Sequence, residues 1–139
     1  MALCGDQSRP ARLAFAPPIS WSRVRELSAH AEISFETHSV HHLALSRLSE
    51  PALRRELENS RARIEAETGR PSLHFCYPYG EPDDIGELGA RAARSLFRTA
   101  TTMVRGRCRP GLDRALLPRV PLYEKDDELT AELKVALAA

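Results

Sequence analysis

Apolar and polar positions along the chain follow a helical period in four segments. The clearest is residues 49–69, where Leu53, Leu57 and Ile64 form one apolar face and Gly69 stands at the expected end. The four predicted helices are residues 20–31, 49–69, 83–96 and 125–139. The residues expected to cap them are Ser20, Ser49, Asp83 or Asp84, and Asp126 or Asp127.

Shorter apolar or alternating runs lie between these helices and predict strands at residues 32–37, 72–77 and 97–102. Residues 115–122 form an extended segment, and Pro118 and Pro121 favour an edge or irregular strand there. Alternating helices and strands with short connections indicate an α/β fold with parallel strands. Four strands suit a small open sheet or part of a larger barrel, and in both folds ligands gather at the C-terminal ends of the strands.

Composition and domain organisation fit a globular protein. The chain has 139 residues, of which 42% are hydrophobic and 28% charged. Residues 1–19 contain three prolines and show no periodicity, so we expect an irregular lead-in followed by one domain at 20–139.

Charge and hydropathy argue against binding to nucleic acids and against attachment to a membrane. The net charge is +1, and the 20 basic residues are interspersed with 19 acidic ones, so neither a nucleic-acid-binding stripe nor a polybasic membrane patch is expected. No apolar run is long enough to span a membrane. Asp6, Arg9 and Arg12 interrupt any signal-like apolar stretch, and the sequence as written predicts a cytoplasmic protein unless a native N-terminus is missing.

Three cysteines, at 4, 76 and 108, are too widely spaced for a Cys-x-x-Cys zinc knuckle, and their odd number argues against a disulfide framework. Cys76 lies in an apolar run, so we expect a small core residue there.

Three histidines in "THSVHH" follow the predicted strand 32–37. His38 and His42 are four residues apart, a spacing that in a helical turn places two imidazoles on one face, where they could bind one divalent ion such as Zn²⁺. His41 would then point elsewhere. A solvated polar turn is the alternative interpretation, and a catalytic ion needs a third protein ligand and an open position.

The "YPYG" sequence follows the predicted strand 72–77. One interpretation is a simple turn whose tyrosines pack in the protein. The other is a rigid rim, in which Tyr77, Pro78 and Tyr79 line a groove for sugar rings and a backbone N–H points to the site.

These segments together resemble the polysaccharide deacetylase family (NodB homology, carbohydrate esterase family 4), over roughly residues 20–137. "THSVHHLALSRLS" resembles the family's His-Ser/Thr-x-x-x-His motif, "HFCYPYG" the Phe-x-Tyr-Pro-Tyr-Gly motif of one subgroup, and "LPRV" that subgroup's late motif. The resemblance implies a distorted (β/α) barrel, here partial, with its first strands missing. It also implies metal-dependent hydrolysis of acetyl groups on a polysaccharide or oligosaccharide.

The resemblance assigns roles to particular residues. It implies that His38 and His42 are ligands of a divalent metal, which would be Zn²⁺, and that Tyr79 offers its backbone N–H to an oxyanion. Tyr77, Pro78 and Tyr79 would bind the substrate, and Arg119 would hold a carboxylate or the rim of the site.

The family's Asp-Asp motif, which supplies the general base and a third metal ligand, has no counterpart in the sequence. We therefore expect weak metal binding and a rate lower by about 10²–10⁴. Asp83, Asp84 or Asp113 could replace the missing carboxylate, although helix capping explains the first two.

Other interpretations remain open. The chain could be a catalytically inactive carbohydrate-binding or scaffold remnant, and an exposed sheet edge could make it a homo-oligomer. It could also be a gene fragment, or an unrelated α/β domain in which the two histidines are incidental.

Overall fold

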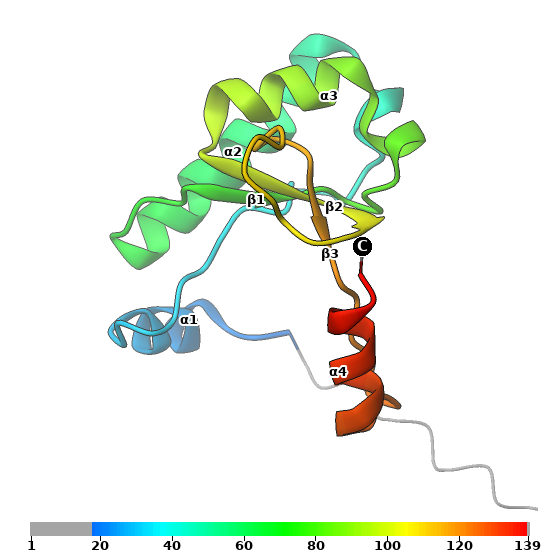
Figure 1. Cartoon of the computed structure of the whole chain (residues 1–139). Coiled ribbons are helices and arrows are strands. Elements are labelled where there is room, and N and C mark those ends of the chain that lie inside the picture. The colour runs from blue at the N-terminus through cyan, green and yellow to red at the C-terminus, as the bar shows by residue number, and fades with distance from the viewer. Residues whose placement is uncertain (1–17, 139) are drawn as a thin grey trace, which may run out of the picture.

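The computed structural model of the chain describes residues 18–138, which are built around a three-stranded parallel sheet (Figure 1). The sheet has the order β1-β2-β3, and the register pairs His74 with Thr99 and Thr101 with Leu117. In chain order the elements are α1 (Trp21–Ser28), a short 3₁₀ turn η1 (Leu45–Arg47), α2 (Glu50–Thr68), β1 (His74–Cys76), α3 (Pro82–Leu96), β2 (Thr99–Arg105), β3 (Leu117–Arg119) and α4 (Glu128–Ala136).

The predicted α/β class, the parallel strands and the edge position of the proline-containing strand β3 are confirmed. The described residues form an open sheet of three strands, so they do not establish a barrel. None of the helices within residues 18–138 has the length and hydropathy needed to cross a lipid bilayer.

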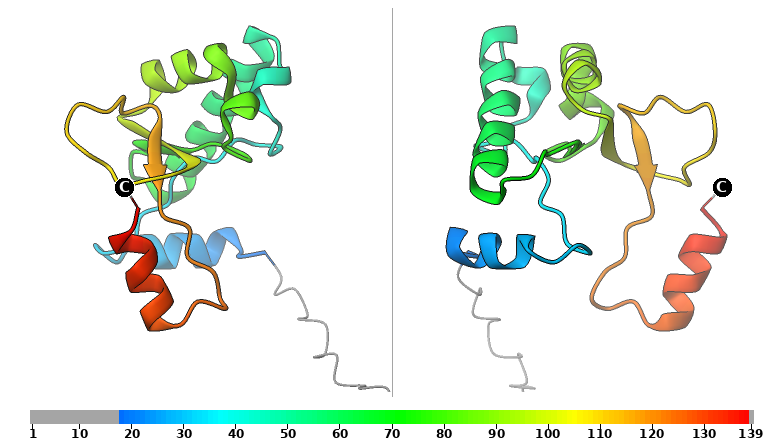
Figure 2. Two further views of the ribbon diagram at one scale, coloured as in Figure 1. Left: turned by 45° about the vertical axis from the view of Figure 1, so that its right-hand side comes forward. Right: turned by 90° about the vertical axis from the view of Figure 1, so that its left-hand side faces the viewer.

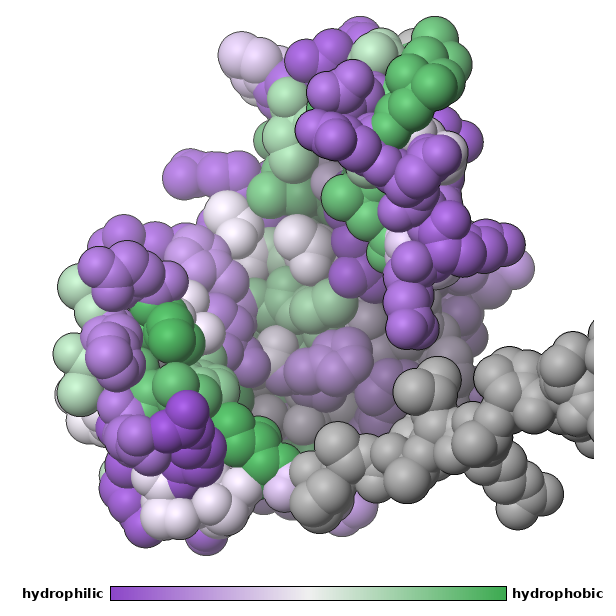
Figure 3. Space-filling view, turned by 90° about the horizontal axis from the view of Figure 1, so that it is seen from below, coloured by the Kyte–Doolittle hydropathy of each residue, from purple (hydrophilic) through white to green (hydrophobic). Residues whose placement is uncertain are grey.

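One face of the sheet is covered and the other is open. Helices α2 and α3 pack side by side over the covered face (Figures 1 and 2). The core between them and the sheet contains Leu53, Leu57, Phe75 and Ala100, each at most 2% exposed. Viewed from below, the opposite face is hollowed between α1 and α4, and polar and weakly apolar side chains mix on the floor of the hollow (Figure 3).

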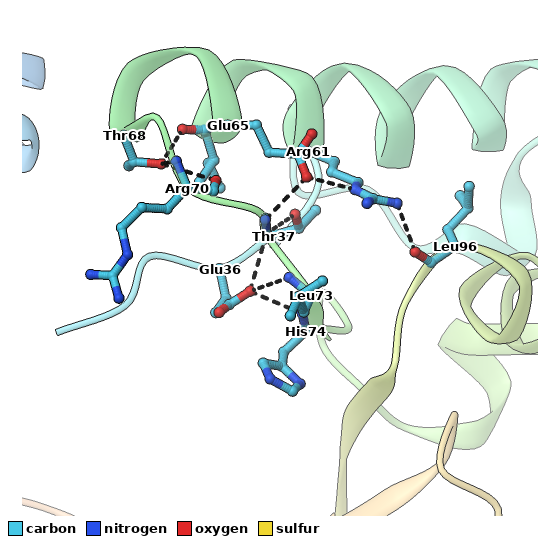
Figure 4. Close-up of polar contacts among 11 residues, drawn as sticks. Glu36, Thr37, Arg61, Glu65, Thr68, Arg70, Leu73, His74 and Leu96 are labelled. Carbon is cyan, nitrogen blue, oxygen red and sulfur yellow. Dashed lines mark hydrogen bonds and ion pairs between the residues drawn. The ribbon is translucent and has the colours of Figure 1, made fainter. Parts of the chain in front are cut away.

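The predicted strand at 32–37 is wrong except at its end. Only Thr37 joins the sheet, through an isolated parallel bridge to Phe75. A side chain, and not a backbone ladder, holds the rest of this segment to the sheet. Glu36 Oε2 accepts hydrogen bonds from the backbone N–H groups of Leu73 and His74, both at 2.9 Å (Figure 4). These bonds fasten the segment to the start of β1, so the residue after Thr37 lies at the C-terminal end of that strand.

Helix ends follow the predicted signals in part. Ser20 accepts a hydrogen bond from Arg23 N–H, and Asp127 accepts one from Thr130 N–H, as caps do. Gly69 ends α2 in the left-handed conformation, with φ of 66°. The cap predicted at Asp83 or Asp84 is wrong, because the cap residue of α3 is Glu81, two or three residues earlier.

Gly80 is the glycine whose replacement should be most costly. Its φ is +79°, and a Cβ there would lie 2.8 Å from the backbone nitrogen of Met103. We expect Gly80→Ala to lower the free energy of unfolding by about 2–4 kcal/mol, since backbone strain adds to a clash with backbone atoms. Chemical denaturation followed by circular dichroism measures this change.

Gly69→Ala is the matched control for Gly80→Ala. The φ of Gly69 is +66°, so an alanine there would have similar backbone strain, but no neighbouring group lies within 4 Å of the new Cβ. Its loss should stay near 1–2 kcal/mol. Equal losses in the two variants would contradict the clash at Gly80.

Candidate functional site

The residues predicted to form a site come from three places along the chain and meet at one edge of the sheet. His38 follows the bridge residue Thr37, Tyr79 follows strand β1, and Arg119 is the last residue of β3. Because the three segments run parallel, their C-terminal ends meet at the same edge. This explains how two sequence motifs more than thirty residues apart form one cluster.

The imidazoles of His38 and His42 lie side by side. Their ring centroids are 4.9 Å apart, and the His42 ring also contacts the Tyr79 ring, edge to face, at 4.8 Å. His38 Nδ1 lies 2.7 Å from the backbone oxygen of Cys76. A carbonyl can only accept a hydrogen bond, so Nδ1–H must donate, which leaves Nε2 of His38 as the basic nitrogen.

The loop that carries the histidines is not the helical turn that the four-residue spacing suggested. Ser39 and His42 both have positive φ, at 64° and 55°. The hydroxyl of Ser39 accepts a hydrogen bond from His42 N–H at 3.0 Å. Two left-handed residues therefore fold the chain back, and this reversal rather than a helix face brings the two rings together.

The histidine pair fits two positions of a metal site. Both rings are exposed at the rim, and a hydrogen bond from the other ring nitrogen to a backbone carbonyl, as His38 makes, is the usual way of fixing a metal-binding imidazole. Within residues 18–138, however, no three His, Cys, Asp or Glu side chains come close enough together to hold one ion. A third protein ligand is thus not provided by the described part of the chain.

The three aspartates suggested as substitute ligands lie elsewhere. Asp113 pairs with Arg94 and accepts from Ala115 N–H at 2.9 Å; both contacts hold the pKa of Asp113 below its usual value. Asp83 and Asp84 occupy the first turn of α3, before the break at Gly86, and not the cluster of the two histidines. Asp84 lines a groove of about 400 Å³ together with Tyr79 and Leu43, so an acid does border the aromatic residue.

Of the three residues predicted to line a sugar groove, only Tyr79 has an exposed side chain, at 56%. Tyr77 is 1% exposed, its hydroxyl donates to the backbone oxygen of Ala115 at 2.8 Å, and Pro78 is fully buried. The groove-lining expectation for the side chains of Tyr77 and Pro78 is therefore corrected: they anchor the turn in the core. Tyr79 has a φ of 60°, and its backbone N–H makes no hydrogen bond within residues 18–138.

Cys76 belongs to the site rather than to the core, which corrects the prediction from sequence. It is half-buried beside His38, on the opposite side of β1 from the buried Phe75. The neighbouring His38, opposed by burial, lowers the pKa of the Cys76 thiol to about 7, and Cys76 in turn raises the pKa of His38. Alternation along β1 was the signal that could have placed Cys76 on the open face.

Arg119 brings a positive charge to the same place, and no carboxylate within residues 18–138 pairs with it. Its Nη1 lies 3.6 Å from Cys76 Sγ, and its Nη2 contacts Met103 Sδ. Its Nε is buried and has no hydrogen-bond partner among the described residues. Arg119 as a whole is half-buried, and only this Nε atom is both buried and unpaired among the described residues.

A family model shows the family of the chain, and solved structures show a similar fold. The family model described as polysaccharide deacetylase matches residues 7–94, more than half of the chain. Two similar solved structures are a polysaccharide deacetylase from Bacillus cereus (TM-score 0.75, 19% identity) and a Streptococcus pyogenes deacetylase in complex with acetate (TM-score 0.74, 17% identity). Each likeness covers 84% of this chain, but the chain spans only 36% and 50% of those two proteins. No curated protein sequence shows significant similarity to the chain.

Proposed function

The chain belongs to the polysaccharide deacetylase family, and on this basis we propose that its histidine cluster serves metal-dependent hydrolysis of acetyl groups on a sugar polymer. The observation that carries the proposal is the meeting of His38, His42 and Tyr79 at the C-terminal edge of parallel strands. His38 and His42 would bind the divalent ion, and imidazole nitrogens are common ligands of Zn²⁺. When bound, such an ion supplies Lewis-acid chemistry to the acetyl carbonyl.

The other residues of the cluster support this chemistry by position. The backbone N–H of Tyr79, which makes no hydrogen bond within residues 18–138, would donate to the oxyanion that forms when water attacks the acetyl carbon. The exposed Tyr79 ring offers a flat apolar face to a sugar, next to the groove lined by Leu43 and Asp84. Arg119 would hold a carboxylate, because its guanidinium lacks an acidic partner within the described residues.

One further carboxylate would complete both the histidine pair and the surroundings of Arg119. It would be the third ligand beside the histidines, and it would pair with the guanidinium of Arg119. The same group, held near water, would act as the general base that hydrolysis needs. We therefore propose that hydrolysis depends on a carboxylate from outside residues 18–138.

A second candidate function is carbohydrate binding without hydrolysis. The absence of a group of three metal-binding side chains within residues 18–138 favours it, because the exposed Tyr79 ring could bind a sugar when the ion cannot be held. This candidate places the chain as a binding or scaffold remnant of the family.

Acetate release and sugar binding, measured on the same samples, test the two functions. The purified chain is incubated with an acetylated chito-oligosaccharide and Zn²⁺, with and without a chelator, and binding is followed by calorimetry. Hydrolysis predicts acetate release that the chelator abolishes. We expect Tyr79→Ala to weaken binding about tenfold, since it removes a stacking face of about 1.4 kcal/mol but keeps the backbone N–H.

Leu129→Ala is the control for Tyr79→Ala, because it removes an exposed apolar side chain from α4, away from the groove. It should bind like the unmodified chain. Binding without acetate release would support the second candidate for this chain, and the absence of binding would rule out a sugar site at Tyr79 under either function.

A further inference from the structure

A single carboxylate holds the loop that carries the histidines. Glu56 projects from α2, and its Oε2 accepts hydrogen bonds from the backbone N–H groups of Val40 (3.0 Å) and His41 (2.8 Å). Its Oε1 lies 2.6 Å from His41 Nδ1. Thus the third histidine of the cluster, which the metal pair does not use, binds this acid.

The Glu56 carboxylate is nearly enclosed, which makes these contacts matter. Glu56 is 8% exposed and lies on the same face of α2 as the fully buried Leu53 and Leu57. Burial alone would raise the pKa of Glu56, but the hydrogen bonds from His41 and Val40 more than offset it and lower the pKa. A buried carboxylate with three donors is a fixed structural group, unlike an exposed ion pair.

The loop needs such a group because its backbone is strained at both ends. Ser39 and His42 adopt positive φ, a conformation that costs a residue other than glycine about 1–3 kcal/mol and persists only where the surroundings enforce it. Val40 and His41, whose N–H groups converge on Glu56, are the two residues between them. Glu56 is therefore bonded to the middle of a bend whose two arms carry His38 and His42.

We propose that Glu56 is a positioning residue that sets the separation of the His38 and His42 imidazoles by holding the backbone between them. Its expected consequence for metal binding rests on the proposed function, whereas the separation of the rings does not. Removing the carboxylate should release Val40 and His41, relax the positive φ angles and let the two rings move apart.

Glu56→Gln tests the proposal with the smallest change of shape. The amide keeps one acceptor oxygen but cannot accept from the backbone pair and from His41 at full strength, since it has lost the charge and one oxygen. Glu58→Gln is the matched control, because Glu58 lies on the same helix, is exposed and, within residues 18–138, pairs only with Arg54.

Two readouts do not need a metal. The ring centroids of His38 and His42 are 4.9 Å apart, so their ring protons should show a nuclear Overhauser effect, a measure of the ring contact, in the unmodified chain and in Glu58→Gln. In Glu56→Gln this contact should disappear, and the amides of Val40 and His41 should exchange with solvent at least about tenfold faster, while core amides of α2 keep their protection. An intact ring contact with unchanged exchange in Glu56→Gln would overturn the proposal.

Zinc affinity provides the third readout. If the unmodified chain binds Zn²⁺, Glu56→Gln should weaken binding about 10–100-fold, as the loss of outer-sphere partners does, and Glu58→Gln should not. Faster loop exchange with unchanged zinc affinity would overturn the positioning role and leave Glu56 a purely structural group. If the unmodified chain binds no Zn²⁺, metal-dependent hydrolysis by this chain fails, and the ring contact alone decides whether Glu56 positions the pair.

Discussion

Phe75→Ala should lower the free energy of unfolding by about 3–5 kcal/mol, which would leave a domain of ordinary stability barely folded. Phe75 is 2% exposed and lies at the centre of the aromatic core. Its ring stacks on Phe97, with centroids 5.1 Å apart, and meets Tyr77 edge to face at 4.9 Å. Removing it leaves a cavity and also breaks two aromatic contacts. Urea denaturation followed by circular dichroism measures the loss.

Phe75→Ala also concerns the site, because the backbone of Phe75 forms a bridge with Thr37, the residue before His38. Phe35→Ala removes the same atoms from a half-buried position and should cost about 1 kcal/mol. Similar losses for the two substitutions would mean that the core is not centred on β1.

His38→Ala and His42→Ala should each weaken Zn²⁺ binding by at least about 100-fold, if the two imidazoles share one ion. Losing a direct ligand costs more than losing an outer-sphere partner, for which 10–100-fold is usual. Calorimetric titration with Zn²⁺ measures both variants. His30→Ala is the control, because His30 is exposed in the turn after α1. This substitution also leaves the same number of histidines as the other two.

The pattern across the three histidine variants separates the possibilities. Equal large losses at His38 and His42, with none at His30, would fit a shared ion. A loss at only one of the two, or an equal small loss at all three, would contradict the shared site and favour incidental surface binding.

The sequence predicted those elements whose signals are local. Helix α2 appears at its predicted position because Leu53 and Leu57 repeat with the helical period and Gly69 supplies the left-handed end. The parallel arrangement followed from the alternation of elements, and that arrangement brings the histidine and tyrosine motifs together.

Features that depend on side chains from distant segments could not be predicted in this way. Residues 32–37 have the alternation of a strand, but Glu36 binds the backbone at the start of β1, and only Thr37 joins the sheet. The Tyr77 side chain faces the core because the alternation of β1 continues through it, two residues after the buried Phe75. The interpretation of "YPYG" as one exposed surface did not take this alternation into account.

Glu56 was overlooked although the sequence held a signal for it. Position 56 falls on the apolar face of α2 with Leu53 and Leu57, and an acid on such a face requires a partner. The sequence alone could not identify that partner as the backbone of Val40 and His41, since only the folded chain brings α2 and the histidine loop together.

The hollow between α1 and α4 divides the molecule into parts of unequal local stability. Helix α4 buries none of its own side chains and α1 buries only Val24 and Ser28, whereas α2, α3 and the sheet share the core. Segments with so little buried apolar surface open at a small fraction of the global unfolding free energy. We therefore expect α1 and α4 to open locally more often than α2, α3 and the sheet, and such opening would widen the hollow without unfolding the core.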